Sequence, residues 1–399
     1  MSRVLKGATF VLPDRLVADG ALAIGHDLIE GIGSHLVHGA ADVVLDPRWL
    51  VVPGFVDVHV HGSLGDDVLD PSAPVRQVAR HLPRFGVTAF CPTTVACEPQ
   101  ALRRVLDAVA DVRRMPEASG ARVLKAHLES NFIAPDYRGA QPLDCIRKPP
   151  AAALSPGDAS APAFTGQDLR DEIARHADEV GIVTLAPEID GALALIADLV
   201  SCGHRVSMGH SGADYDAARA GIAAGACHAT HLFNRMPPLS HRAPGLIGAV
   251  LESDGVASEI IFDGHHVHPA VALAAMRAKR PERVMAITDA SSVAGLPLGS
   301  TGNLGGRRIT AHHDLARLDD GTIAGSVLTM DRAFRMLVQQ MGVSILDAVK
   351  VCSTTPAREL GLDQQGAIEV GAFADLTVLD EDLRVVMTLV GGHVAYTRQ

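Results

Sequence analysis

Eight short apolar runs, separated by longer helical segments, fill the middle of this chain. Alternation of this kind is typical of βα units around a parallel sheet, and eight units favour a closed (β/α)8 barrel over an open sheet. The intervening segments, such as Pro99–Arg113, are rich in alanine and arginine, which favour helix. The runs are Val51–Val60, Val87–Cys91, Val123–Leu128, Ile182–Ala186, Arg205–Gly209, Ala226–Thr230, Glu259–Phe262 and Val284–Thr288.

The two ends of the chain have a different pattern, that of short β-strands. Between Ala21 and Ile32 the apolar segments are broken at Gly25 and His26, which suits a hairpin turn, and residues 366–399 alternate and turn at glycines. We expect both ends to form one small β-sandwich domain. The predicted bounds are 1–52 and 361–399 for this domain and 53–360 for the barrel, with long loops at 131–166 and 236–248.

Composition excludes several classes of protein. A hydrophobic fraction of 47% and a charged fraction of 20% suit a soluble globular chain, and the net charge of −11 argues against nucleic acid and anionic membranes as partners. No apolar run approaches the ~18 residues of a membrane span, and the first residues lack the pattern of a signal peptide. The six cysteines have no disulfide-like spacing. We therefore predict reduced thiols and a cytoplasmic location.

Polar residues close most of the apolar runs. In a (β/α)8 barrel the active site lies at the carboxyl ends of the strands, so these residues are expected to meet at one mouth. They are His59, His61, Glu129, Glu188, His210, His231, the Asp263–His266 group and Asp289.

The spacing of His59 and His61 favours metal binding. Side chains alternate along a strand, so both imidazoles lie on one face. Glu129, His210 and His231 add further ligands at the same edge, and nitrogen and oxygen donors without thiolate suit zinc, or alternatively iron, cobalt or manganese. We predict one or two divalent ions per chain.

Other polar residues are expected to have structural roles. His127 and Lys125 are predicted to share the inward face of Glu129's strand as buried or paired groups, with a carbamylated lysine as the alternative. His228 is expected to pack against a helix. Glu188 is expected to be a structural or water-binding carboxylate, with a role as metal ligand as the alternative. The histidines expected in solvent are His26, His35, His38, His176, His312, His313 and His393.

Several motifs together resemble a known family. They are PGFVDVHVHG (53–62), HLES (127–130), MGHSGADYDAARAGIAAGACHATHLFNRMPPL (208–239), DGHHVHP (263–269), ITDA (287–290), AGSVLTM (324–330) and GAIEVGAFADLTVLD (366–380). The chain resembles the N-acetylglucosamine-6-phosphate deacetylases of the amidohydrolase superfamily, from about residue 20 to its end.

The resemblance implies a role for each matching residue. Glu129, His210 and His231 would hold the principal ion, and His59 and His61 match a variant that binds a second ion bridged by Glu129. Asp289 corresponds to the catalytic aspartate and His266 to a histidine that contacts the substrate amide. The implied substrate contacts are Ala140, Gln141, Asn234, Arg235, Arg242, Ala324 and Gly325, with Arg242 reaching the phosphate of the neighbouring subunit of a homodimer.

The chain departs from the family pattern at three places. Ser130-Asn131 replaces Gly-Pro after Glu129, Gln141 replaces a histidine near the sugar, and Arg235 replaces a small residue beside the phosphate. The metal and acid–base positions of the family pattern are intact, so the resemblance implies metal-dependent hydrolysis of the acetamide of N-acetylglucosamine 6-phosphate. The galactosamine epimer, another amidohydrolase substrate such as a cyclic amide or an N-acyl amino acid, and a barrel that only binds a sugar remain as alternatives.

Overall fold

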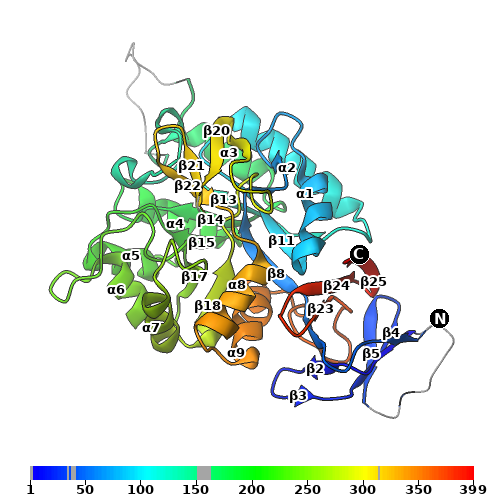
Figure 1. The fold of residues 1–399 in the computed structure, drawn as a ribbon. Helices are drawn as coiled ribbons and strands as arrows, with labels where there is room; N and C mark the ends of the chain where they lie inside the picture. The colour runs from blue at the N-terminus through cyan, green and yellow to red at the C-terminus, as the bar shows by residue number, and fades with distance from the viewer. Residues whose placement is uncertain (1–2, 34–35, 37–41, 151–162, 313–314) are drawn as a thin grey trace, which may run out of the picture.

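A barrel of parallel strands forms the larger part of the molecule in the computed structural model (Figure 1). The structure describes residues 3–33, 36, 42–150, 163–312 and 315–399. Neighbouring strands pair in chain order, which confirms the predicted architecture. The barrel strands are β8 (Phe55–Val60), β11 (Val87–Thr94), β13 (Ala126–Glu129), β14 (Val180–Leu185), β15 (Arg205–Met208), β16 (His228–Ala229), β17 (Ala257–Ile261) and β18 (Val284–Ile287).

Helices surround the barrel, and their sequence pattern explains why. In α2, Leu102, Val105, Leu106 and Val109 recur at helical spacing and are buried against the strands, while arginines occupy the other face. The helices are α1 (Val75–His81), α2 (Pro99–Arg114), α3 (Gly166–Arg175), α4 (Ala192–Ser201), α5 (Tyr215–Ala223), α6 (Gly245–Glu252), α7 (Pro269–Lys279), α8 (Met330–Arg335), α9 (Ile345–Val349) and α10 (Thr355–Glu359). Within the described residues, no helix is both long and apolar enough to cross a membrane.

The two ends of the chain meet in a second, smaller body that carries both termini (Figure 1). One sheet has the order β5-β4-β1-β6 and the other β25-β24-β23-β7-β2-β3, so strands from both ends pair directly. The strands are β1 (Arg3–Lys6), β2 (Thr9–Val11), β3 (Leu16–Val17), β4 (Ala21–Gly25), β5 (Leu28–Ile32), β6 (Val43–Val44), β7 (Leu50–Pro53), β23 (Leu376–Leu379), β24 (Val385–Val390) and β25 (His393–Thr397).

The small domain has a hydrophobic core of its own between the sheets. Phe10, Leu22, Val51 and Leu376 belong to it and are fully or nearly fully buried. The expected hairpin is formed by β4 and β5, and both turn residues, His26 and Asp27, have positive φ, as a tight two-residue turn requires. The domain bounds themselves stay a prediction.

Some predicted elements differ in the structure. The first apolar run is divided, because β7 belongs to the terminal sheet and β8 to the barrel. The predicted loop at 236–248 ends within α6. Part of the other loop, 151–162, lies outside the described residues, as do His35, His38 and His313.

The structure also contains short strands that the sequence did not predict. An antiparallel sheet follows β18, formed by β19 (Thr301–Leu304), β20 (Arg307–His312), β21 (Leu315–Leu318) and β22 (Ile323–Ser326). The short strands β9 (Gly62–Ser63) and β10 (Asp66–Asp67) form a ribbon after β8, and β12 (Arg122–Val123) pairs with β11.

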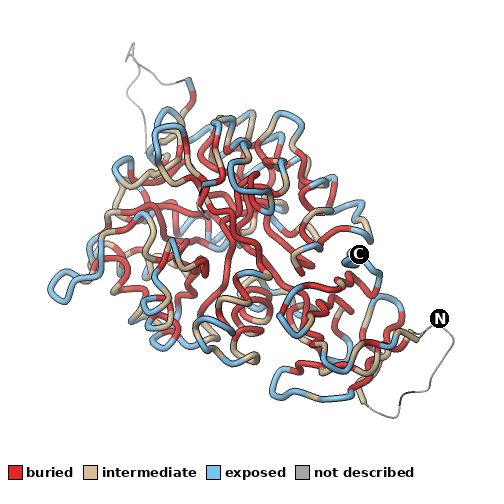
Figure 2. Tube along the Cα trace, in the orientation of Figure 1, coloured by how far each residue is buried: buried red, intermediate tan, exposed pale blue. Residues whose placement is uncertain are grey.

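The barrel interior is buried throughout, as the red tube in Figure 2 shows. All six residues of β8 and all eight of β11 are buried. Polar groups there must find partners inside the protein, and they do so near the carboxyl ends of the strands. This end of the barrel holds the site.

Candidate metal centre and active site

Three side chains converge at the carboxyl ends of three barrel strands. Glu129 ends β13, His210 follows β15 and His231 follows β16, and all three are buried. Glu129 Oε1 lies 2.8 Å from Nε2 of His210 and 2.8 Å from Nε2 of His231, and the two Nε2 atoms lie 3.1 Å apart. These are the three predicted ligands of the principal ion.

The hydrogen bonding of His210 shows that a cation fits this group. Its Nδ1 lies 2.8 Å from the carbonyl oxygen of Tyr137, and because a carbonyl only accepts, Nδ1 must carry the proton. In neutral imidazole, Nε2 then presents a lone pair to the lone pairs of Glu129 Oε1. A metal ion between these donors, in the manner of a three-ligand catalytic site, removes that conflict.

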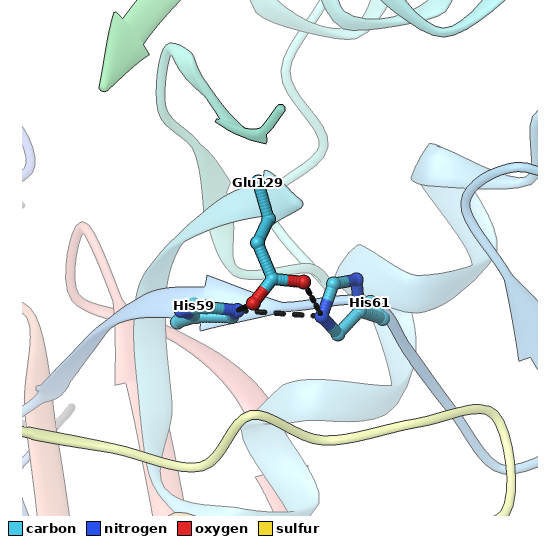
Figure 3. A group of neighbouring side chains, drawn as sticks. All are labelled: His59, His61 and Glu129. Carbon is cyan, nitrogen blue, oxygen red and sulfur yellow. Dashed lines mark hydrogen bonds and ion pairs between the residues drawn. The ribbon is translucent and has the colours of Figure 1, made fainter. Parts of the chain in front are cut away.

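His59 and His61 form a second group beside the first (Figure 3). His59 lies in β8 and His61 follows its last residue, and their Nε2 atoms lie 3.3 Å apart. His61 Nδ1 lies 3.1 Å from the carbonyl of Thr93, and His59 Nδ1 lies 3.0 Å from Glu259 Oε2. Each ring therefore directs its other nitrogen toward the site, which is the orientation a metal ligand needs.

Glu129 lies between the two groups (Figure 3). Its Oε1 contacts His210 and His231, whereas its Oε2 lies 3.5 Å from Nε2 of His61. Figure 3 shows the Glu129 carboxylate directed at both His59 and His61. This position suits a carboxylate that serves one ion and bridges to another.

Asp289 completes the cluster from the end of β18. Its Oδ1 lies 3.2 Å from Nε2 of His61 and 3.4 Å from Nε2 of His59. Asp289, His210 and His231 all have positive φ, at 50°, 46° and 29°. Residues with side chains rarely adopt this backbone region, and strain of this kind is concentrated at functional sites.

Burial and the surrounding charges set the protonation of the site. Burial raises the pKa of Glu129, but His210 and the other imidazoles lower it by a larger amount. The pKa of Glu129 is therefore held well below the usual range. Burial also opposes a charge on His61, yet Asp289 and Glu129 raise its pKa to about 9. The pKa of Asp289 is lowered because His59 and His61 outweigh its burial. Both carboxylates are thus ionised at neutral pH.

A cavity of about 480 Å³ opens onto this cluster. His61, Glu129, His210, His231 and Asp289 contribute to its wall. Six of the predicted substrate-contact residues also line it: Ala140, Gln141, Asn234, Arg235, His266 and Gly325. Two others do not belong to the described lining, since Ala324 is fully buried within β22 and Arg242 is exposed in the segment before α6.

His266 is held in one orientation within the cavity wall. Its Nδ1 lies 2.5 Å from Asp263 Oδ2, and Asp263 Oδ1 accepts from the backbone nitrogens of His265 and His266 at 2.8 Å. This arrangement places the proton on Nδ1 and leaves Nε2 as the ring atom available to a ligand.

Arg235 supplies the cation of the cavity wall. A side chain at Gly139 would place its Cβ 2.5 Å from Arg235 Nε, so the glycine makes room for the guanidinium. Asn234 donates from Nδ2 to the carbonyl of His231 at 3.2 Å. The turn after β16 therefore carries a metal-ligand candidate, an amide and a cation in close succession.

Several expected structural roles can now be compared with the structure. His127 is buried between the carbonyl of Val58 and Thr184 Oγ1, at 2.9 and 2.8 Å. His228 packs toward Glu359 of α10, with His228 Nε2 and Glu359 Oε2 3.6 Å apart. Glu188 accepts from Ser211 Oγ at 2.7 Å and from the Gly212 nitrogen at 2.6 Å, the two residues that follow His210.

Two of these expectations were wrong. Lys125 is exposed and precedes β13 at the amino end of the barrel, so it cannot share the inward face with Glu129. His176 is buried rather than solvated, because it closes α3 with Nδ1 3.0 Å from the carbonyl of Glu172 and Nε2 3.2 Å from Asp107 Oδ1. His26, His312 and His393 are exposed, as expected.

Two buried carboxylates near the site were not assigned a role from sequence. Glu259 bonds to His59 from β17, and Asp57 of β8 accepts from Thr288 Oγ1 at 2.6 Å. Burial raises the pKa of Asp57 to about 7. A usable signal was present, since each acid lies inside a largely apolar strand, where an unpaired charge is costly.

Comparisons with known proteins agree with this geometry. The amidohydrolase family model matches residues 50–395. The chain belongs to the amidohydrolase family. A Bacillus subtilis N-acetylglucosamine-6-phosphate deacetylase is 32% identical over 99% of this chain and 97% of its own length. An Escherichia coli O157:H7 N-acetylgalactosamine-6-phosphate deacetylase is 36% identical over 99% of this chain and all of its own length.

A solved structure gives the same fold. The N-acetyl-D-glucosamine-6-phosphate deacetylase of Mycobacterium smegmatis, in a mutant form in complex with N-acetyl-D-glucosamine-6-phosphate, has a TM-score of 0.87. It is 32% identical and covers 99% of this amidohydrolase and 100% of its own chain. The resemblance stated from sequence motifs is thereby confirmed.

Proposed function

We propose that this amidohydrolase removes the acetyl group from N-acetylglucosamine 6-phosphate, giving glucosamine 6-phosphate and acetate. The observation that carries the proposal is one cavity in which the carboxylate of Asp289, the paired donors of Glu129, His210 and His231, and the cation Arg235 face the same space. Such a cavity accommodates a neutral amide at one end and an anion at the other.

The donor set favours zinc, with iron, cobalt or manganese as alternatives. Glu129, His210 and His231 would hold the principal ion, and His59 and His61 a second one. A divalent ion supplies two effects in such a site: it acidifies water and it polarises a carbonyl.

Asp289 is the proposed proton carrier of the reaction. Its lowered pKa keeps it ionised at neutral pH, so it is ready to accept a proton from the attacking water. As the water oxygen bonds to the acetyl carbon and the C–N bond breaks, the same carboxyl group returns the proton to the departing sugar nitrogen. His266, fixed by Asp263, is positioned to donate to the carbonyl oxygen as that oxygen gains charge.

The phosphate would be bound at the outer part of the cavity. Arg235 and Asn234 line it, and guanidinium groups bind phosphate through paired charge-assisted hydrogen bonds. Arg242 is exposed and outside the described cavity lining of its own chain. We propose that it reaches the phosphate of the second subunit in a homodimer.

All six cysteines are free thiols, which supports a cytoplasmic location.

The deciding experiment is a deacetylation assay with four compounds: the 6-phosphates of N-acetylglucosamine and N-acetylgalactosamine and the two unphosphorylated sugars. We expect turnover of the phosphorylated compounds, with the glucosamine epimer preferred. The similarity to an enzyme named for the galactosamine epimer makes that epimer the second candidate. If neither phosphate is turned over while a cyclic amide or an N-acyl amino acid is, the proposed substrate class is wrong.

A further inference from the structure

The side-chain amide of Gln141 is bonded at both of its ends. Its Oε1 accepts from the backbone nitrogen of Ala96 at 2.7 Å, and its Nε2 donates to Oε2 of Glu129. A backbone N–H only donates, so Oε1 must face Ala96 and the donor must face Glu129. The orientation of this buried amide follows from its partners.

This contact completes the restraint on the Glu129 carboxylate. Oε1 lies between the Nε2 atoms of His210 and His231, and Gln141 holds the other oxygen. The last torsion of a glutamate side chain is otherwise broad, so a carboxylate bound through one oxygen alone keeps rotational freedom. With Gln141 in place, both oxygens have fixed directions before any ion binds.

We propose that Gln141 is a positioning residue for the metal centre, which holds Glu129 in the orientation that binds the principal ion. This inference rests on the proposed function of Glu129, His210 and His231 as the ligands of that ion. Hydrogen bonds to metal ligands orient them and raise affinity, and their loss typically costs about 10–100-fold in metal binding.

The loop that carries Gln141 has a separate anchor. Asn131 donates from Nδ2 to the carbonyls of Cys97 and Cys145, both at 2.7 Å. Asn131 and Gln141 thus both attach this loop to the segment after β11, but only Gln141 bonds to Glu129. Asn131 therefore provides a matched control for the loss of a buried amide from the same loop.

The experiment measures the affinity of the full-length protein for Zn²⁺ by competition with a chromophoric chelator. Gln141→Met keeps the length of the side chain but removes both hydrogen bonds. We expect the dissociation constant of the principal ion to rise about 10–100-fold. Asn131→Leu is expected to leave it within about threefold, because the carboxylate restraint is intact. Thermal melting of each variant reports whether it folds. If Gln141→Met does not fold, Gln141→Asn takes its place, because the asparagine side chain is too short to span both partners.

Kinetics separate positioning of the metal ligand from a contact with the sugar. If Gln141 acts on Glu129, excess Zn²⁺ restores kcat of the Gln141→Met variant while KM stays near the original value. An unchanged Zn²⁺ affinity with a raised KM would overturn the inference, as would an equal loss of affinity in Asn131→Leu. Failure of the original protein to bind Zn²⁺ would instead reject the proposed metal site itself.

Discussion

The backbone nitrogen of Asp289 donates to the carbonyl oxygen of His59 at 3.0 Å, where the last barrel strand meets the first. This bond closes the barrel between residues that also share the site, since the Asp289 carboxylate lies 3.4 Å from the His59 ring. Just below, Thr288 donates to the buried Asp57. Closure of the fold and placement of the proposed proton carrier therefore depend on the same pair of strands.

Removal of metal is expected to abolish activity. The three principal donors lie within 3.1 Å of one another, and His210 Nε2 presents a lone pair to Glu129 Oε1, so the site is arranged for a cation. Dialysis against a chelator followed by rate measurements tests this, with Zn²⁺, Fe²⁺, Co²⁺ and Mn²⁺ added back in turn. Full turnover in protein shown by elemental analysis to be free of metal would contradict the proposal.

Substitution of Asp289 by asparagine is expected to remove turnover while the protein stays folded with its principal ion. The amide cannot accept the proton, and general acid–base catalysis is typically worth ~10²–10⁴ in rate. Glu188→Gln is the matched control, because Glu188 is a carboxylate that follows β14 and, in the described contacts, bonds only to Ser211 and Gly212. If Asp289→Asn retains half of the original kcat, Asp289 is not the proton carrier.

The paired change His59→Gln with His61→Asn is expected to lower the number of ions bound per chain or to weaken loading of the first. Both imidazoles direct Nε2 into the site, His59 from β8 and His61 from the position that follows it. Elemental analysis of protein produced with excess metal measures the change. His204→Gln, a buried histidine whose Nδ1 lies 3.0 Å from the Val180 carbonyl, is the control and should keep the original stoichiometry. Equal stoichiometry in all three proteins would make the pair structural.

Arg242→Ala is expected to raise KM strongly for the 6-phosphate and hardly at all for the unphosphorylated sugar. The lost contact is a charge-assisted hydrogen bond to phosphate, worth about 1.5–3 kcal/mol. Arg205→Ala, which removes an exposed arginine at the opposite end of the barrel, is the control.

Mixed dimers decide where Arg242 acts. Chains carrying Arg242→Ala are combined with chains carrying Asp289→Asn, and subunit exchange is verified. An arginine that serves the neighbouring site gives hybrids in which the Arg242→Ala chain regains normal affinity. A plain average of the two parent activities would show that it acts within its own chain.

Stability is expected to depend on pH through Glu359. Burial raises the pKa of this carboxyl, but His228, Arg358 and Arg283 together lower it from 4.5 to about 2. A lowered pKa means that the ionised form stabilises the folded state, so this contribution is present above about pH 4.5 and is lost as the pH falls toward 2. Glu359→Gln should reduce the free energy of unfolding at pH 7 by about 1–2 kcal/mol, allowing for partly exposed partners.

Urea unfolding of the original protein and Glu359→Gln at pH 7 and pH 3.5 measures this effect. The difference between them should shrink at the lower pH. Glu381→Gln, which removes an exposed partner of Arg48, should change stability much less at either pH. A difference for Glu359→Gln that is the same at both pH values would exclude ionisation as its cause.

The sequence by itself determined the barrel and most of the residues that meet at its mouth. Alternation along a strand placed His59 and His61 on one face, and the rule that parallel strands end at one edge gathered Glu129, His210, His231 and Asp289. The local periodicity of β8 and α2 carried this information, because it depends on residues close together in the chain.

Only the tertiary structure decided how these groups hold one another. The bond from Gln141 to Glu129 and the bond from His59 to Glu259 join residues on different strands and loops, with no fixed spacing in the sequence. The same limit explains the error at Lys125, since its exposure depends on where β13 begins within the barrel. Periodicity predicts which face a side chain takes, whereas its partners depend on the three-dimensional packing of distant segments.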